Sequence, residues 1–171
     1  MILQTVQSRE DYEKMCRYGV LKSDGIHIFD ESFRMAYKWM AEQLSKKTGI
    51  KPDGEMLPVW AWYQWEGKRY PEIKHSYDEE LAERKHLVLI TFNAPDDVVL
   101  LSDFDYWHFV LNDLPISEDG KEECDFSEAE KEKSWQKVFE VDFNSDNNYS
   151  IQAVLWEIKQ EWVKCVDFLE F

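Results

Sequence analysis

The residue types best suited to chemistry gather in one short segment, residues 102–108, which reads Ser-Asp-Phe-Asp-Tyr-Trp-His. The segment places the carboxylates of Asp103 and Asp105 and the imidazole of His108 at the end of a predicted strand and in the first turn of a predicted helix. Two carboxylates in Asp-x-Asp spacing can bind a hard divalent cation. A carboxylate at the N-cap instead accepts hydrogen bonds from the first helical turn. Helix capping, substrate binding and metal binding are the three interpretations; we favour capping and predict no metal site.

A second candidate is the aromatic run at residues 59–65, Val-Trp-Ala-Trp-Tyr-Gln-Trp, which favours a strand with large rings on both faces. Such rings stack on planar ligands while amides and cations fix a ligand's orientation, but the same rings also fill protein cores. We expect the core to use most of these tryptophans and a pocket to use one or two. Polar residues follow the run at Lys68, Arg69, Lys74 and His75. The candidate ligand-binding residues are Tyr37, Trp60, Trp62, Gln64, Trp65, Asp103, Asp105, Trp107 and His108.

Patterns that indicate catalysis are weak. The chain has no Gly-x-Ser-x-Gly elbow and no glycine-rich phosphate loop, and it contains only six glycines. Its four histidines lack the His-x-x-x-His spacing of many metal sites. Glu157 and Glu161 could serve as general acids or bases, but nothing distinguishes them from the other carboxylates among the 35 Asp and Glu residues. We therefore assign no catalytic residue and no cofactor, and an enzyme and a binding protein both remain open.

An excess of acid narrows the classes of partner. The 171 residues include 35 Asp and Glu against 20 Lys and Arg, a formal net charge of −15, which opposes binding to phosphate backbones. No apolar run is long enough for a membrane span, and no signal-peptide pattern opens the chain. We therefore expect a cytoplasmic protein with a small molecule or nucleotide as ligand and without a membrane or nucleic-acid partner. The three cysteines are odd in number and lack Cys-x-x-Cys spacing, so no disulfide framework is predicted.

Hydrophobic periodicity predicts helices and strands in turn along the whole chain. Helices are predicted at 8–19, with Ser8 as N-cap and Gly19 at the end, at 31–48 with Gly49 following, at 104–111 and at 127–139, with a helical turn near 78–83. Strands are predicted at 2–6, 26–29, 59–65, 86–92, 98–101, 151–158 and 163–168. The fold class is α+β: one compact domain over residues 1–171, with about six strands in mixed or antiparallel sheets and three to four helices. Two small sheets around a cleft are an alternative arrangement.

Several segments are specific enough to compare with known families. They are Thr-Val-Gln at 5–7, Ala-Tyr-Lys-Trp-Met at 36–40, the aromatic run from Pro58 to Trp65, the segment at 100–108 and the closing segment at 151–157. Together they resemble the bacterial domain-of-unknown-function family 3841 over nearly the whole chain. The resemblance implies a single-domain bacterial protein, and it implies no activity.

The order of elements is also similar to that of ADP-ribosyltransferase-like domains, which bind NAD in a cleft between two small sheets. That resemblance places the residues of the NAD site near Gln4 or Thr5, Tyr37 and Glu157. The first position lacks the basic residue of the template, and no Glu stands in the late-strand register at 152–154. The resemblance therefore implies a degenerate form of the fold.

Three functions follow as hypotheses. The favoured one is an α+β domain that binds a small molecule or nucleotide in a tryptophan-lined pocket. The second is a degenerate ADP-ribosyltransferase-like enzyme that binds NAD. The third is an acidic interaction module, in which residues 117–133, with eight acids and three lysines, recruit a basic protein partner.

Overall fold

The computed structural model describes residues 1–23, 25, 30–54, 56–72, 86–117, 122–144 and 148–169. The strands of the described chain are β1 (Ile2–Ser8), β2 (Val20–Leu21), β3 (Val59–Gln64), β4 (Leu87–Asn93), β5 (Leu100–Asp103), β6 (Ile151–Leu155), β7 (Ile158–Lys159) and β8 (Val163–Phe168). Its α-helices are α1 (Arg9–Tyr18), α2 (Arg34–Thr48), α4 (Phe104–Leu111) and α5 (Glu128–Ser134). Short 3₁₀ turns lie at Glu31–Phe33, Asp96–Val98, Glu123–Asp125, Trp135–Phe139 and Gln160–Trp162.

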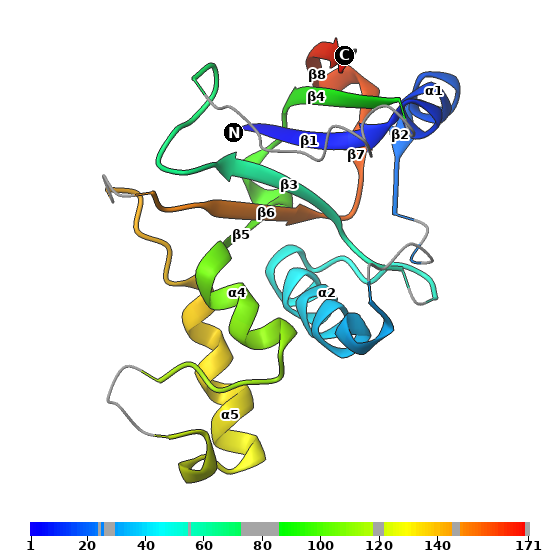
Figure 1. Ribbon diagram of the computed structural model, residues 1–171. Helices are drawn as coiled ribbons and strands as arrows, with labels where there is room; N and C mark the ends of the chain where they lie inside the picture. Colours follow the sequence, from blue (N-terminus) through cyan, green and yellow to red (C-terminus); the bar gives the residue numbers. More distant parts are fainter. Residues whose placement is uncertain are drawn as a thin grey trace.

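Six strands form one antiparallel sheet in the order β5-β6-β3-β1-β4-β8, and β2 pairs with β7 in a small second sheet. Figure 1 shows α2 and α4 beneath β3 and β6, α5 beyond α4, and α1 at the far end of β1. The predicted α+β class with an antiparallel sheet and four helices is confirmed. Within the described residues the alternative of two small sheets around a cleft is not formed, because β1 pairs with both β3 and β4 and joins the strands into one sheet.

Most element boundaries agree with the sequence. The strand predicted at 151–158 is an exception, because it divides into β6 in the main sheet and β7, which pairs with β2. The strand predicted at 98–101 begins two residues later, since Asp96–Val98 forms a 3₁₀ turn after Pro95. The helix predicted at 127–139 is α-helical only to Ser134 and then tightens into the 3₁₀ turn Trp135–Phe139. The strand predicted at 26–29 and the helical turn predicted near 78–83 lie outside the described residues.

Helix ends follow the predicted capping chemistry. The Ser8 hydroxyl accepts a hydrogen bond from the amide of Asp11 at the start of α1. Gly19 ends that helix in the left-handed region, with φ of 78°, and donates its N–H to the carbonyl of Met15 at 2.8 Å. Gly49 ends α2 in the same way, with φ of 72°. Glycine is favoured at both positions because it has no Cβ to strain this conformation.

Replacing Gly19 by alanine is expected to lower the free energy of unfolding by about 1–2 kcal/mol, the cost of a left-handed conformation for an L-residue with a side chain. A Cβ built at Gly19 meets no atom within 4 Å, so backbone strain alone carries the effect. Urea unfolding of Gly19→Ala measures it, with Gly19→Asn as the matched control, because asparagine tolerates this conformation better. Equal stability of the alanine variant and the wild type would contradict the expectation.

The protein has two hydrophobic cores, one on each face of the sheet, and β3 contributes side chains to both. Val59 and Ala61 are buried on one face, in a core that also contains Met15 of α1. Trp60 lies on the opposite face, where the second core contains Met40 of α2 and Trp107 of α4. We call this second face the helix-side face. The prediction that β3 carries rings on both of its faces is confirmed, since Tyr63 packs against the first core.

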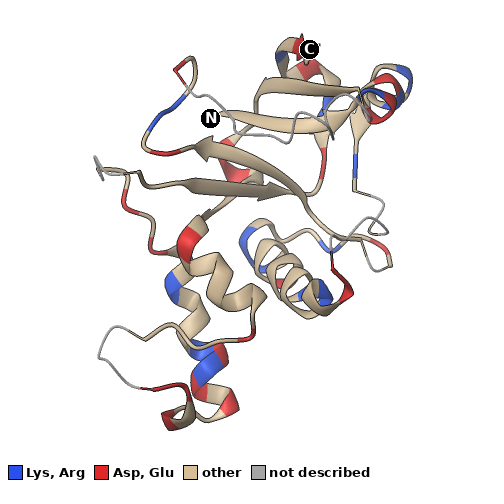
Figure 2. Ribbon diagram, in the orientation of Figure 1, with Lys and Arg blue, Asp and Glu red and all other residues tan. Residues whose placement is uncertain are grey.

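Charge is distributed unevenly over these elements. The four inner strands β1, β3, β4 and β6 contain no Lys, Arg, Asp or Glu. Figure 2 shows charged residues on the helices and connecting segments, with acids gathered at the lower end of α5. No helix of the described chain is long and apolar enough to cross a membrane. The charged residues of the described chain therefore lie outside the four inner strands.

Candidate functional site

Aromatic side chains gather in two groups between β3 and the helices that cover it. The ring centroid of Trp60 lies 4.9 Å from the ring centroid of Trp107 and 5.4 Å from the ring centroid of Tyr37. Tyr37 also meets Trp107 edge to face at 5.9 Å. Trp107 is 2% exposed, whereas Trp60 and Tyr37 are partly exposed. Three predicted site residues from three elements are thus brought together.

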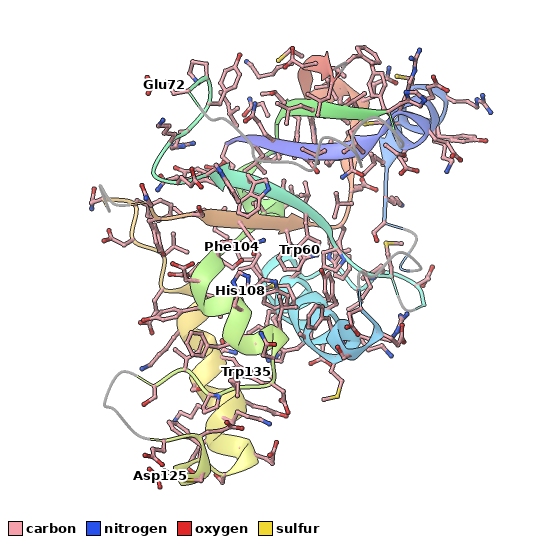
Figure 3. The ribbon with its side chains drawn as sticks, viewed as in Figure 1. Trp60, Glu72, Phe104, His108, Asp125 and Trp135 are labelled. Carbon is pink, nitrogen blue, oxygen red and sulfur yellow. The ribbon has the colours of Figure 1, made fainter. Side chains whose placement is uncertain are left out.

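A second group of rings lies toward the N-terminus of α4. Trp62 lies 4.5 Å from Trp65 and 5.0 Å from Phe104, and Phe104 lies 4.5 Å from His108. Figure 3 shows Phe104 and His108 on α4, and Trp60 beneath β3 beside α2. Trp62, Trp65 and Phe104 are half-buried and His108 is exposed, so this group faces solvent. We call the two groups together the aromatic layer: Tyr37, Trp60, Trp62, Trp65, Phe104, Trp107 and His108.

The carboxylates of the 102–108 segment lie at the start of α4, beside this layer. Asp103 is buried and is the N-cap of α4; its Oδ1 accepts a hydrogen bond from the amide of Tyr106 at 2.8 Å. Asp105 is exposed in the first turn, where its charge suits the positive end of the helix dipole. The Nδ1 atom of His108 lies 2.9 Å from the carbonyl oxygen of Phe104. The capping interpretation is therefore confirmed for Asp103.

A tight hairpin fixes Trp65 at the edge of the layer. Trp65 and Lys68 exchange two backbone hydrogen bonds of 2.9 Å, and Glu66 and Gly67 between them have φ of 47° and 77°. Positive φ at both central residues is the signature of a type I′ turn. The side chain of Gln64, a predicted ligand-binding group, donates to the carbonyl of Tyr149 at 3.0 Å and so anchors the hairpin. Lys74 and His75 of the predicted polar segment lie outside the described residues.

One row of residues crosses all six strands on the helix-side face, as the strand registers show. Direct partners in antiparallel strands project from the same face, so the whole row points one way. We call it the polar row, and its members in spatial order are Ser102, Gln152, Trp62, Gln4, Thr91 and Cys165. The Nε2 atom of Gln4 donates to Thr91 Oγ1 at 2.9 Å in the buried part of the row. The sequence singled out Trp62 and, through the ADP-ribosyltransferase-like template, Gln4, but it did not indicate the row as a whole.

At the other end of the polar row, buried polar atoms lack partners. Ser102 is 0% exposed and Gln152 is 8% exposed, yet Ser102 Oγ and Gln152 Oε1 have no hydrogen-bond partner among the described residues. The same holds for Nε1 of Trp60, on the strand beside Gln152. A buried polar group without a partner costs about 1–3 kcal/mol, and most such groups in proteins are satisfied. Three neighbouring exceptions beneath an aromatic layer need a specific explanation.

The signal that could have revealed these residues is polarity at inward strand positions. Gln152 stands between Ile151 and Ala153 in a strand that is buried along its whole length, while Ser102 and Gln4 each follow two apolar residues in their strands. Their juxtaposition was not available from the sequence, because Ser102 and Gln152 meet only through the β5–β6 register. Phe104, a member of the aromatic layer, was also not selected.

Tyr149 ties the segment before β6 to the cap of α4. Its hydroxyl bonds to the Asp103 carboxylate and accepts the amide N–H of Asp142 at 3.3 Å. Burial is the largest cause that raises the pKa of Tyr149, and the Asp103 carboxylate raises it further, while the Asp142 amide acts in the opposite direction. The neighbouring Ser150 carbonyl accepts the amide of Phe104 at 3.1 Å.

The raised pKa of Tyr149 predicts a loss of stability in alkali. Because the folded state holds this proton more tightly than the unfolded state, the contribution is complete below about pH 10 and declines as the pH rises further. Tyr149→Phe is expected to make the fall in unfolding free energy above about pH 10 shallower. Urea unfolding at about pH 8 and about pH 11 measures the slope. Tyr18→Phe, at an exposed tyrosine, controls for the loss of any hydroxyl, and a slope unchanged in Tyr149→Phe would refute the expectation.

The residues named by the ADP-ribosyltransferase-like template have other partners. Gln4 bonds to Thr91, Tyr37 packs on Trp60, and the Glu157 carboxylate pairs with Lys22 at 3.3 Å. With the strands joined in one sheet, these contacts give that template no support.

Acids of the 117–133 segment have structural contacts. Asp125 and Glu130 complete capping boxes, and Lys131 pairs with Glu128 and Asp113, each at 2.8 Å. Residues 118–121 lie outside the described residues, and a basic protein partner stays a prediction.

The fold and this layer define an α+β protein with an uncharged inner sheet covered by aromatic side chains. Residues 2–133 match the family model described as Domain of unknown function (DUF3841), and the chain therefore belongs to that family. No curated protein and no solved structure gives a significant match. The matched range contains Trp60, Ser102 and Trp107, whereas Gln152 lies beyond it.

Proposed function

We propose that this protein binds a small molecule on the helix-side face, between the aromatic layer and the Ser102–Gln152 end of the polar row. The observation that carries the proposal is a set of buried polar atoms on three neighbouring residues, Ser102 Oγ, Gln152 Oε1 and Trp60 Nε1, which have no partner among the described residues. A ligand that bonds to these atoms would remove the cost of burying them.

The aromatic layer supports the same location. Trp62 and Phe104 present rings beside the polar atoms, and aromatic rings supply large contact areas for planar ligands. Both side chains are half-buried, and His108 next to them is exposed. A ligand could therefore approach from this end of the layer without disturbing the fully buried Trp107.

The test is a thermal-shift screen of the purified full chain against nucleosides, nucleotides and other metabolites, followed by tryptophan fluorescence titration of each compound that raises the melting temperature. At least one class is expected to bind, and Ser102→Ala and Gln152→Met are each expected to weaken its binding by about tenfold, the value of one lost hydrogen bond. Failure of every compound to bind the folded protein would refute the proposal.

Gln43→Met is the matched control for the glutamine variant. Gln43 is also 8% exposed, but it lies on α2 and its Oε1 accepts a hydrogen bond from Gln136 at 3.3 Å. The same chemical change at a partnered glutamine away from the polar row should leave ligand affinity unchanged. Equal loss of binding in Gln43→Met and Gln152→Met would mean that the loss comes from lower overall stability, and it would contradict a site at Gln152.

A further inference from the structure

We infer that the ligand of this site is an uncharged planar ring with a hydrogen-bond donor beside an acceptor, as in a nucleobase or a ring carboxamide, and that phosphorylated compounds are excluded. The inference rests on the proposed function and names the class of ligand. The sequence is compatible with a nucleotide as the ligand, whereas the inferred class leaves out phosphorylated compounds.

The polar atoms define both halves of the required pattern. Gln152 Oε1 accepts, the indole N–H of Trp60 donates, and the hydroxyl of Ser102 does either. Ser102 and Gln152 are direct partners in the β5–β6 register, and Trp60 is the diagonal neighbour of Gln152 on β3. Side chains so related lie roughly 5 Å and 7–8 Å apart. One edge of a planar ring with a donor and an acceptor is of the right size to meet them.

The same atoms disfavour a charged ligand. All three polar groups are neutral, and an ion buried against neutral groups loses more hydration free energy than these hydrogen bonds return. The nearest helix N-terminus, that of α4, does not offer its amides to a phosphate. The amide of Tyr106 already bonds to the Asp103 carboxylate, and the amide of Phe104 bonds to the carbonyl of Ser150.

Negative charge around the site also disfavours an anionic ligand. Asp103 directly follows Ser102 and is itself buried, so a phosphate near Ser102 would lie close to a carboxylate. The net charge of −15 also lowers the concentration of anions at the surface. A cationic ring is disfavoured because it would lose its hydration against the same three neutral groups.

The experiment compares uncharged ring compounds with anionic compounds that carry the same ring. Adenine, adenosine and adenosine monophosphate form one series, and nicotinamide and nicotinate form a second, each titrated into the full chain with tryptophan fluorescence as the readout. In the series that binds, the uncharged members are expected to bind at least about tenfold more tightly than the anionic member. Ser102→Ala and Gln152→Met are expected to weaken binding of the uncharged members, and Gln43→Met is not.

The outcomes separate this inference from the proposed function. If the anionic member binds as tightly as its uncharged parent, or if the metabolite screen yields only cationic or non-planar compounds, the inference is wrong and the proposed function stands. If neither the two series nor the screen yields a compound that binds the folded protein, both are wrong.

Discussion

Trp107→Ala is expected to lower the free energy of unfolding by about 3–5 kcal/mol, the range for removal of a large buried aromatic side chain. Trp107 is 2% exposed and touches Tyr37 of α2 and Trp60 of β3, so it joins both helices of the helix-side face to the sheet. Truncation at this position leaves a cavity where α2, α4 and β3 meet. The measurement is urea unfolding followed by far-ultraviolet circular dichroism.

Phe109→Ala is the matched control for this variant. It also removes an aromatic side chain from α4, but Phe109 is 40% exposed and belongs to neither core. We expect a clearly smaller loss, because surface substitutions usually change stability little. Losses of similar size in the two variants would mean that Trp107 does not carry the packing of α4 against the sheet.

Thr91→Val is expected to lower stability and Ser102→Ala is not, although both remove one hydroxyl from the polar row. Thr91 Oγ1 accepts a hydrogen bond from Gln4, so Thr91→Val breaks a buried hydrogen bond and should cost about 0.5–1.5 kcal/mol. Ser102 Oγ has no partner among the described residues, so alanine removes a buried polar group without breaking a bond. The ligand-free Ser102→Ala protein should equal or exceed the wild type in stability.

The melting temperatures of the ligand-free proteins measure this difference, since 1 kcal/mol corresponds to about 2–4 °C in a domain of this size. Gln152→Met extends the test to the second polar group, and it too should not lower the melting temperature. Destabilisation by Ser102→Ala as large as that by Thr91→Val would show that the hydroxyl has a partner in the ligand-free protein, such as a bound water. That result would remove the observation on which the proposed ligand site depends.

Local chemistry made most of the fold predictable. The cap at Asp103 and the glycines that end α1 and α2 are decided by residues within a turn of each position. The aromatic run that became β3 is decided by β-propensity over its own length. The single sheet was not decided locally, because it depends on β1, at the start of the chain, pairing with β3 and β4, which lie in the middle of the chain.

The candidate site was predictable only in part, for the same reason. Trp60, Trp62 and Trp107 are conspicuous by residue type, and the structure places them in the two groups of the aromatic layer. Ser102 and Gln152 are ordinary residue types separated by 50 positions of sequence, and only the strand register makes them neighbours. A partnerless polar atom is a property of the whole fold, so no sequence pattern reports it directly.

The uncharged inner strands have a consequence for how the chain avoids aggregation. Four neutral segments of high β-propensity are the type of sequence that pairs between chains when it is exposed. In the folded sheet all four are interior strands, and the outer positions belong to β5, which has four residues, and to β8, which exposes Lys164 and Asp167. Short or charged outer strands oppose pairing between molecules. The order of strands thus places the segments most prone to self-association where a second molecule does not reach them.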